Sequence, residues 1–144
     1  MNTKKGFTLI ELLVVIAIIG ILASVVLASL NTARGKGANA AIKANLSGVR
    51  AQAELIYSDD NDYDAVCGAN SVTQNATVAS SITAANTASG GTAVCGKPAS
   101  GQANGWAISS ALKSTEGSNT HWCVDGNGKS VGRTSHIAAT DVAC

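Results

Sequence analysis

The residues that could do chemistry in this sequence are two histidines, scattered carboxylates and four cysteines. His121 and His136 lie near each other in the chain, and Asp125 closely follows the first of them. An imidazole and a carboxylate could serve a hydrolase, but no motif links them to an activated nucleophile. The sequence also has no phosphate-binding loop and no cofactor fingerprint. We therefore expect no enzyme and no cofactor, with the histidines on strands or at the surface; a hydrolase using His121 and Asp125 is the alternative.

An acidic run raises the question of a calcium site. Asp60, Asp62 and Asp64 match the first three ligand positions of an EF-hand loop. Ala65 and Ser71 stand where that loop needs glycine and a bidentate glutamate. The run therefore predicts a solvated loop that ends a helix, and we expect no metal.

Basic residues between positions 34 and 50 raise the question of nucleic acid or lipid binding. These residues are Arg34, Lys36, Lys43 and Arg50. No aromatic side chains are interleaved with them as stacking platforms, and the net charge of the chain is only +1. We expect a solvated helix face or contacts with neighbouring subunits.

The four cysteines indicate disulfide chemistry. They form no C-x-x-C pair, and the histidines do not complete a zinc spacing. An even number of separated cysteines downstream of an apolar segment predicts two disulfides in an oxidising compartment, with four buried thiols as the alternative. Three pairings are possible. We favour Cys67–Cys95 and Cys123–Cys144, since each pair closes a local loop.

Glu11 stands at the start of a long apolar run. From Leu12 to Leu30 no residue is charged, and this run is close in length to the ~20 residues that a membrane-spanning helix needs. An unpaired carboxylate costs about 2.5–3.5 kcal/mol at the bilayer centre and less near an interface. Taken alone, Glu11 is equally consistent with an acid that reaches water at the headgroup level. Lys4 and Lys5, on the N-terminal side of the run, favour a cytoplasmic N-terminus.

The sequence Lys-Lys-Gly-Phe-Thr-Leu-Ile-Glu at residues 4–11, followed by the apolar run, resembles the class III signal of type IV prepilins. In that family, which includes type II secretion pseudopilins, a prepilin peptidase cuts after the glycine, here Gly6. It also methylates the new N-terminal residue, here Phe7. The resemblance makes residues 1–6 a cleaved leader and assigns Glu11 to assembly. Its carboxylate would neutralise the α-amino group of Phe7 on a neighbouring subunit, and breaking such a buried pair costs about 3–5 kcal/mol.

The apolar helix departs from the family at one point. Many members have a proline near the position of Ala28, whereas Pro98 is the only proline of this chain. Gly20, Gly35 and Gly37 remain as weak points, because glycine costs about 1 kcal/mol relative to alanine in a helix. The sequence leaves open whether the helix melts between Gly20 and Gly37 in a filament.

The elements that position these residues follow from hydrophobic spacing. An apolar stripe at helical spacing continues beyond the membrane run: Ile42, Leu46, Val49, Ala53 and Ile56. We therefore predict one helix from about Phe7 to Tyr57. Residues 7–30 form its transmembrane or filament-core half, and residues 31–57 form an amphipathic continuation under a small head.

The head is expected in residues 58–144. Residues 58–103 are predicted as a connecting αβ-loop held by Cys67 and Cys95, with room for a short helix at Val78–Asn86. In residues 104–144, three strands are expected around the turn Asp125–Gly128: Gly105–Lys113, Thr120–Val124 and Lys129–Gly132. This arrangement gives an α+β fold with two disulfides, in which an antiparallel sheet packs on the stripe. It resembles the C-terminal sheet of pilins, where a disulfide bounds the exposed variable region, here Cys123 to Cys144.

The resemblance implies a structural role. The precursor would be anchored in the inner membrane with its head outside, and the assembled subunits would form an extracellular pilus for adhesion, motility or DNA uptake. The implied partners are identical subunits, the prepilin peptidase and the inner-membrane assembly platform, with any nucleic-acid contact arising only at the level of the filament. The alternative is a minor pilin or a type II secretion pseudopilin in a short periplasmic fibre.

Overall fold

The computed structural model describes residues 6–68, 73–98 and 104–144. Most of the expected leader, residues 1–5, and two parts of the expected αβ-loop, residues 69–72 and 99–103, lie outside the described residues. The chain divides into two compact units, of which the first ends at Arg34 and the second is Gly35–Cys144. Helix α1 contributes residues to both units.

Helix α1 is one continuous helix, Leu9–Asp60, of 52 residues. It begins after Thr8 and continues past Tyr57, the residue at which the sequence pattern ended. Asn61 follows it with a φ of 57°, and its N–H donates to Tyr57 O at 2.8 Å. Asparagine tolerates this left-handed conformation better than most residues, so it can close the helix there.

The first unit has no interior of its own. Every described residue from Gly6 to Arg34 is exposed, including the apolar side chains of the run. By length and composition, α1 contains a segment able to cross a membrane. These side chains therefore need an apolar environment outside the chain, because water around them is unfavourable.

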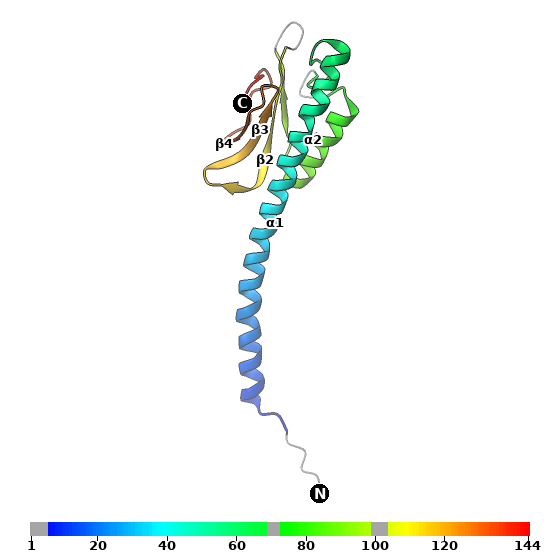
Figure 1. Cartoon of the computed structure of the whole chain (residues 1–144). Helices are drawn as coiled ribbons and strands as arrows, with labels where there is room; N and C mark the ends of the chain where they lie inside the picture. The colour runs from blue at the N-terminus through cyan, green and yellow to red at the C-terminus, as the bar shows by residue number, and fades with distance from the viewer. Residues whose placement is uncertain (1–5, 69–72, 99–103) are drawn as a thin grey trace. The chain divides into compact units, whose positions relative to one another are not determined.

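The second unit contains an antiparallel sheet in the order β1-β2-β3-β4. Its strands are β1 (Val94–Gly96), β2 (Ala107–Glu116), β3 (Asn119–Asp125) and β4 (Ser130–Arg133). Within this unit, the C-terminal half of α1 and helix α2 (Ala76–Ser89) lie on one face of the sheet (Figure 1). The α+β class expected from the sequence is therefore confirmed.

The main core lies between the helices and this face of the sheet. All five residues of the predicted apolar stripe, Ile42 to Ile56, are buried, as expected. They pack with Val78 of α2, Ile108 of β2 and Trp106, which is fully buried. The period read from the sequence thus identified the buried face of α1 correctly.

Helix α2 is longer than the short helix allowed for at Val78–Asn86. Asn75 caps its start, since Asn75 Oδ1 accepts hydrogen bonds from Thr77 N at 2.9 Å and Val78 N at 3.1 Å. Gly90, with a φ of 77°, closes its end and donates from its N–H to Asn86 O.

The prediction of three strands was wrong by one. Strand β1 lies in the segment predicted as loop and pairs with β2, with Cys95 opposite Ile108. With only three residues, β1 has no readable alternation, and tertiary pairing and the Cys67–Cys95 bond hold it in place. The other three strands form near their predicted positions, around the predicted turn after Asp125.

The second face of the sheet is covered by the C-terminal segment, residues 134–144, called here the strap. Ile137 of the strap packs in a small separate cluster with Ala107 of β2 and Cys123 of β3. The backbone of the strap is also tied to the segment after β1, where Lys97 N donates to Ala139 O at 3.1 Å. The sheet therefore separates two apolar clusters.

Candidate functional site

The predicted processing site lies just outside helix α1. Gly6, Phe7 and Thr8 have no regular secondary structure, and Phe7 is 85% exposed. The peptide bond between Gly6 and Phe7 is thus in an accessible, non-helical segment. A protease can bind a segment of this kind without first unwinding a helix.

Glu11 closes a capping box with Thr8. Thr8 donates to Glu11 Oε2 from its backbone N at 2.9 Å and from its hydroxyl at 2.8 Å, and Glu11 N donates to Thr8 Oγ1 at 3.3 Å. This reciprocal arrangement satisfies helix-start donors that have no partner within the helix. The role of Thr8 was not predicted from the sequence, although Thr-x-x-Glu before an apolar run is the known signal of a capping box.

The three glycines predicted as weak points differ in surroundings. Gly20 and Gly37 have open space where a Cβ would lie, whereas a Cβ on Gly35 would stand 2.9 Å from Ser114 Oγ. Gly35 is buried, and its lack of a side chain allows α1 to approach β2 closely. The helix is continuous through all three positions, and its behaviour in a filament stays a prediction.

A polar cluster fastens α1 to β2 within the second unit. Asn39, 1% exposed, accepts from Lys113 N at 2.8 Å and Ser114 N at 3.2 Å, and donates to Ser114 O at 2.7 Å. Its amide also donates to Glu116 Oε1 at 3.1 Å. These bonds coincide with the irregular stretch of the β2–β3 pairing between Ala111 and Glu116. The amide of Asn39 thus bonds backbone groups where the ladder is interrupted.

Two of the basic residues also contact the sheet, contrary to the expected solvated face. Lys43 Nζ lies 2.5 Å from Glu116 Oε2 and 4.3 Å from the ring centre of Trp122. The hydrogen bond from Lys43 holds the pKa of the Glu116 carboxyl below its ordinary value. Arg50 Nε donates to Asp125 O at 3.1 Å. Arg34 and Lys36 are exposed.

Both disulfides form in the favoured pairing. Cys67–Cys95 has a Cα–Cα distance of 5.4 Å, and Cys123–Cys144 one of 5.8 Å. The first bond joins the segment after α1 to β1, and the second joins β3 to the strap. The described residues contain no free cysteine.

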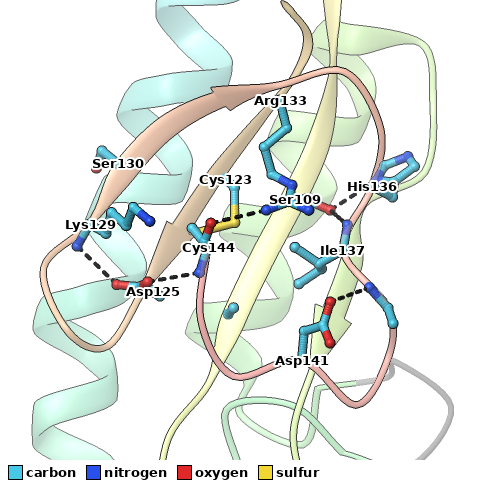
Figure 2. The surroundings of a disulfide bond; sticks show 12 residues. Ser109, Cys123, Asp125, Lys129, Ser130, Arg133, His136, Ile137, Asp141 and Cys144 are labelled. Atoms are coloured by element: carbon cyan, nitrogen blue, oxygen red, sulfur yellow. Dashed lines mark hydrogen bonds between the residues drawn. A yellow bond between two sulfur atoms is a disulfide. The ribbon is translucent and has the colours of Figure 1, made fainter.

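The residues considered for a hydrolase have other partners. The Asp125 carboxylate, 1% exposed, accepts from Lys129 N and from Cys144 N, each at 2.9 Å (Figure 2). The ring centres of His121 and His136 are 4.1 Å apart. Asp125 therefore joins the β3–β4 turn to the strap, and its carboxylate bonds backbone rather than an imidazole.

Asp60 is the last residue of α1, and Asp62 and Asp64 lie in the loop that follows it, as expected of a run that ends a helix. Asp62 Oδ1 accepts from Asp64 N at 2.9 Å, and Asp64 pairs with Lys97 at 3.4 Å. Among the described residues, no group of three or more histidine, cysteine or acidic side chains is arranged to hold a metal ion.

Comparison with known proteins gives two matches. Residues 1–27 match the family described as the prokaryotic N-terminal methylation motif. A stretch of 63 residues is 44% identical to the "Type IV wide pilus major component PilA4" of Thermus thermophilus. That stretch covers 44% of this chain and 48% of the relative, so the chain spans about half the length of the relative it matches. No solved structure matches the chain significantly.

The motif match includes Gly6, Phe7 and Glu11, the residues on which the resemblance was based. The apolar start of α1, the antiparallel sheet and the two disulfides agree with the fold that the resemblance implied. The N-terminal motif and the partial match to a pilus component thus make this chain similar to type IV prepilins.

Proposed function

We propose that this chain is a non-enzymatic structural subunit of a type IV pilus. The leader is removed after Gly6, Phe7 becomes the methylated N-terminus, and the apolar helices of many copies pack together in the filament core. The matched methylation motif and the pilin relative, whose name describes a major pilus component, support this proposal.

The observation that carries the proposal is the exposed apolar helix of the first unit. Its side chains make no interior within the chain, and Leu22, for example, is 61% exposed. Burying each such side chain away from water is worth about 1.5–3 kcal/mol. A membrane satisfies this requirement in the precursor, and neighbouring helices satisfy it in the filament.

Exchanging lipid for other helices gives little hydrophobic gain, because lipid tails are as apolar as leucine. Close packing and polar pairs must therefore select the arrangement of subunits. Glu11 is suited to this role. Both of its side-chain bonds to Thr8 use Oε2, and Oε1 accepts no hydrogen bond from the described residues. One carboxylate oxygen thus stays available to the α-amino group of Phe7 on a neighbouring subunit.

The partners follow from this role. The precursor is a substrate of a prepilin peptidase, which acts at the accessible Gly6–Phe7 bond, and identical subunits join it on an inner-membrane assembly platform. The head is outside the membrane, where the two disulfides form. The filament serves adhesion, motility or DNA uptake, and nucleic acid contacts the assembled fibre rather than a single subunit.

The direct test is intact-mass spectrometry, without reduction, of filaments sheared from the source cells. A dominant species should lack Met1–Gly6, carry one added methyl group and lack the hydrogens of four thiols. Finding only the uncleaved chain, in filaments and membranes alike, would refute the proposal.

The role of Glu11 is tested by comparing Glu11→Ala with Glu11→Gln. Both changes remove the negative charge, but glutamine keeps a carbonyl oxygen for Thr8. Both variants should be cleaved at Gly6 and form few or no filaments, because breaking a buried charge pair costs about 3–5 kcal/mol. Normal filament yields from Glu11→Gln would show that the charge of Glu11 is not needed for assembly.

A second candidate is a type II secretion pseudopilin or a minor pilin. The phrase Cys123-Val124-Asp125 favours the pseudopilin, because it resembles the entry to a glycine turn in that group. In this chain the phrase ends β3 and leads into the turn to β4. Processed protein found in the membrane fraction and absent from sheared filaments would favour this candidate.

A further inference from the structure

The strap, residues 134–144, is bonded to the rest of the head at several positions, among them Thr134, Ala139 and Cys144. Two further attachments join it to β2 and β3. One is the disulfide from Cys144 to Cys123. The other is Ser109 of β2, a fully buried residue whose hydroxyl bonds two consecutive strap residues, His136 and Ile137 (Figure 2). Neither the proposed pilus function nor the sequence motifs assign any role to this second attachment.

The hydrogen-bond partners of Ser109 determine which protonation state of His136 is compatible with the attached strap. Ser109 Oγ accepts a hydrogen bond from Ile137 N at 3.1 Å. Its own proton can then be donated to His136 Nδ1, 2.9 Å away, when that nitrogen is unprotonated. If His136 Nδ1 were protonated, the buried hydroxyl would have to turn its proton away from its acceptor. A buried donor without a partner is unfavourable.

His121 has the opposite arrangement. The hydroxyl of Thr120 donates to Thr134 O at 2.8 Å. Toward His121 Nδ1, at 2.7 Å, the Thr120 hydroxyl therefore acts as acceptor, and His121 Nδ1 carries a proton. The two imidazoles thus differ at Nδ1: that nitrogen donates a hydrogen bond in His121, whereas in His136 it accepts one and carries no proton.

The charged groups near this face also disfavour a proton on His136. His121 has its ring centre 4.1 Å from that of His136, and Arg133 of β4 pairs with His121 across the strands. The nearby carboxylates are committed to backbone groups, Asp125 to Cys144 N and Asp141 to Ala138 N. Burial, and secondly the proximity of His121, lower the pKa of His136, and these two causes outweigh a hydrogen bond with Ser109 that acts in the opposite direction.

We propose that the strap is a pH-sensitive latch, in which neutral His136 holds the strap against Ser109 and protonation of His136 releases it. Because the closed strap lowers the affinity of His136 for a proton, the open strap binds that proton more tightly. The closed form is therefore fully favoured above the ordinary histidine pKa of about 6.5, and it loses stability as pH falls below that value. Release exposes Ile137 and the Cys123–Cys144 bond.

The test compares the two disulfides of the full-length protein in non-ionic detergent. Each sample is briefly treated with a phosphine reductant, and free thiols are alkylated and measured by peptide mass spectrometry. Cys67–Cys95, which packs in the helix-facing cluster rather than in the cluster of Ile137, is the internal reference for the effect of pH on the reductant. Between about pH 7.5 and pH 5, the ratio of Cys123–Cys144 to Cys67–Cys95 reduction should rise about tenfold, the factor expected for losing one hydrogen bond. An unchanged ratio would overturn the proposal.

Two matched variants identify the responsible histidine. Glutamine at position 136 supplies a carbonyl oxygen for Ser109 and does not titrate, so His136→Gln should give a ratio independent of pH. His121→Gln leaves His136 intact and should keep the pH response. A response that survives His136→Gln, or that disappears only with His121→Gln, would show that His136 is not the latch.

Discussion

Replacing Asn39 by leucine should destabilise the head strongly. The change keeps a helix-forming side chain of similar size but removes the partner of two N–H groups, those of Lys113 and Ser114, and of one carbonyl, that of Ser114. A buried group that loses its partner costs about 1–3 kcal/mol. Lys113 is exposed and Ser114 half-buried, so water can compensate in part. Taking the lower end of this range of costs for each of the three backbone groups, we expect a loss of about 2–4 kcal/mol in the free energy of unfolding.

The assay is urea unfolding of the full-length protein in non-ionic detergent, with the disulfides intact. Trp106 and Trp122 both lie in the second unit, so their fluorescence reports on the head. Asn45→Ala is the matched control, because Asn45 lies half-buried on the same helix and makes no side-chain hydrogen bond within the described residues. The control should change stability by no more than about 0.5 kcal/mol. If Asn39→Leu costs as little as the control, the amide of Asn39 does not fasten α1 to β2.

Two further predictions use the same unfolding assay. Gly35→Ala should destabilise the head by about 1–3 kcal/mol, because the added Cβ would stand 2.9 Å from Ser114 Oγ. Gly37→Ala should stabilise the head by up to about 1 kcal/mol, because its Cβ would enter open space and alanine favours the helix. Equal effects of the two substitutions would contradict the inference that α1 approaches β2 closely at Gly35. Replacing Cys67 and Cys95 together by alanine should cost about 3–4 kcal/mol on the loop-closure account, and an unchanged urea midpoint would show that this bond does not restrain the unfolded chain.

The sequence predicted features whose signals are local. The apolar run and the stripe from Ile42 to Ile56 predicted α1 and its buried face, because helical spacing is a property of one continuous segment. The turn signal at Asp125–Gly128, with a short segment on each side of it, likewise predicted β3 and β4. The capping box of Thr8 and Glu11 was equally local, and the signal for it was present but not used.

The features that were missed depend on partners far away in the chain. Asn39 bonds Ser114, 75 positions away, and nothing near Asn39 in the sequence marks it as buried. Strand β1 exists through its pairing with β2 and its bond from Cys95, and three residues carry too little pattern to predict it. The contact of Ser109 with His136 is likewise visible only after the strap folds over the sheet.

The division of the head into two apolar clusters has a consequence for engineering. Side chains that face the helices, such as Ile108 and Val124, belong to one cluster, and Ile137 of the strap belongs to the other. Foreign peptides inserted among the exposed strap residues Ala138 to Thr140 would not enter the helix-facing cluster. The strap is thus the part of the head where an antigen or a binding peptide could be displayed without disturbing the helix-facing cluster.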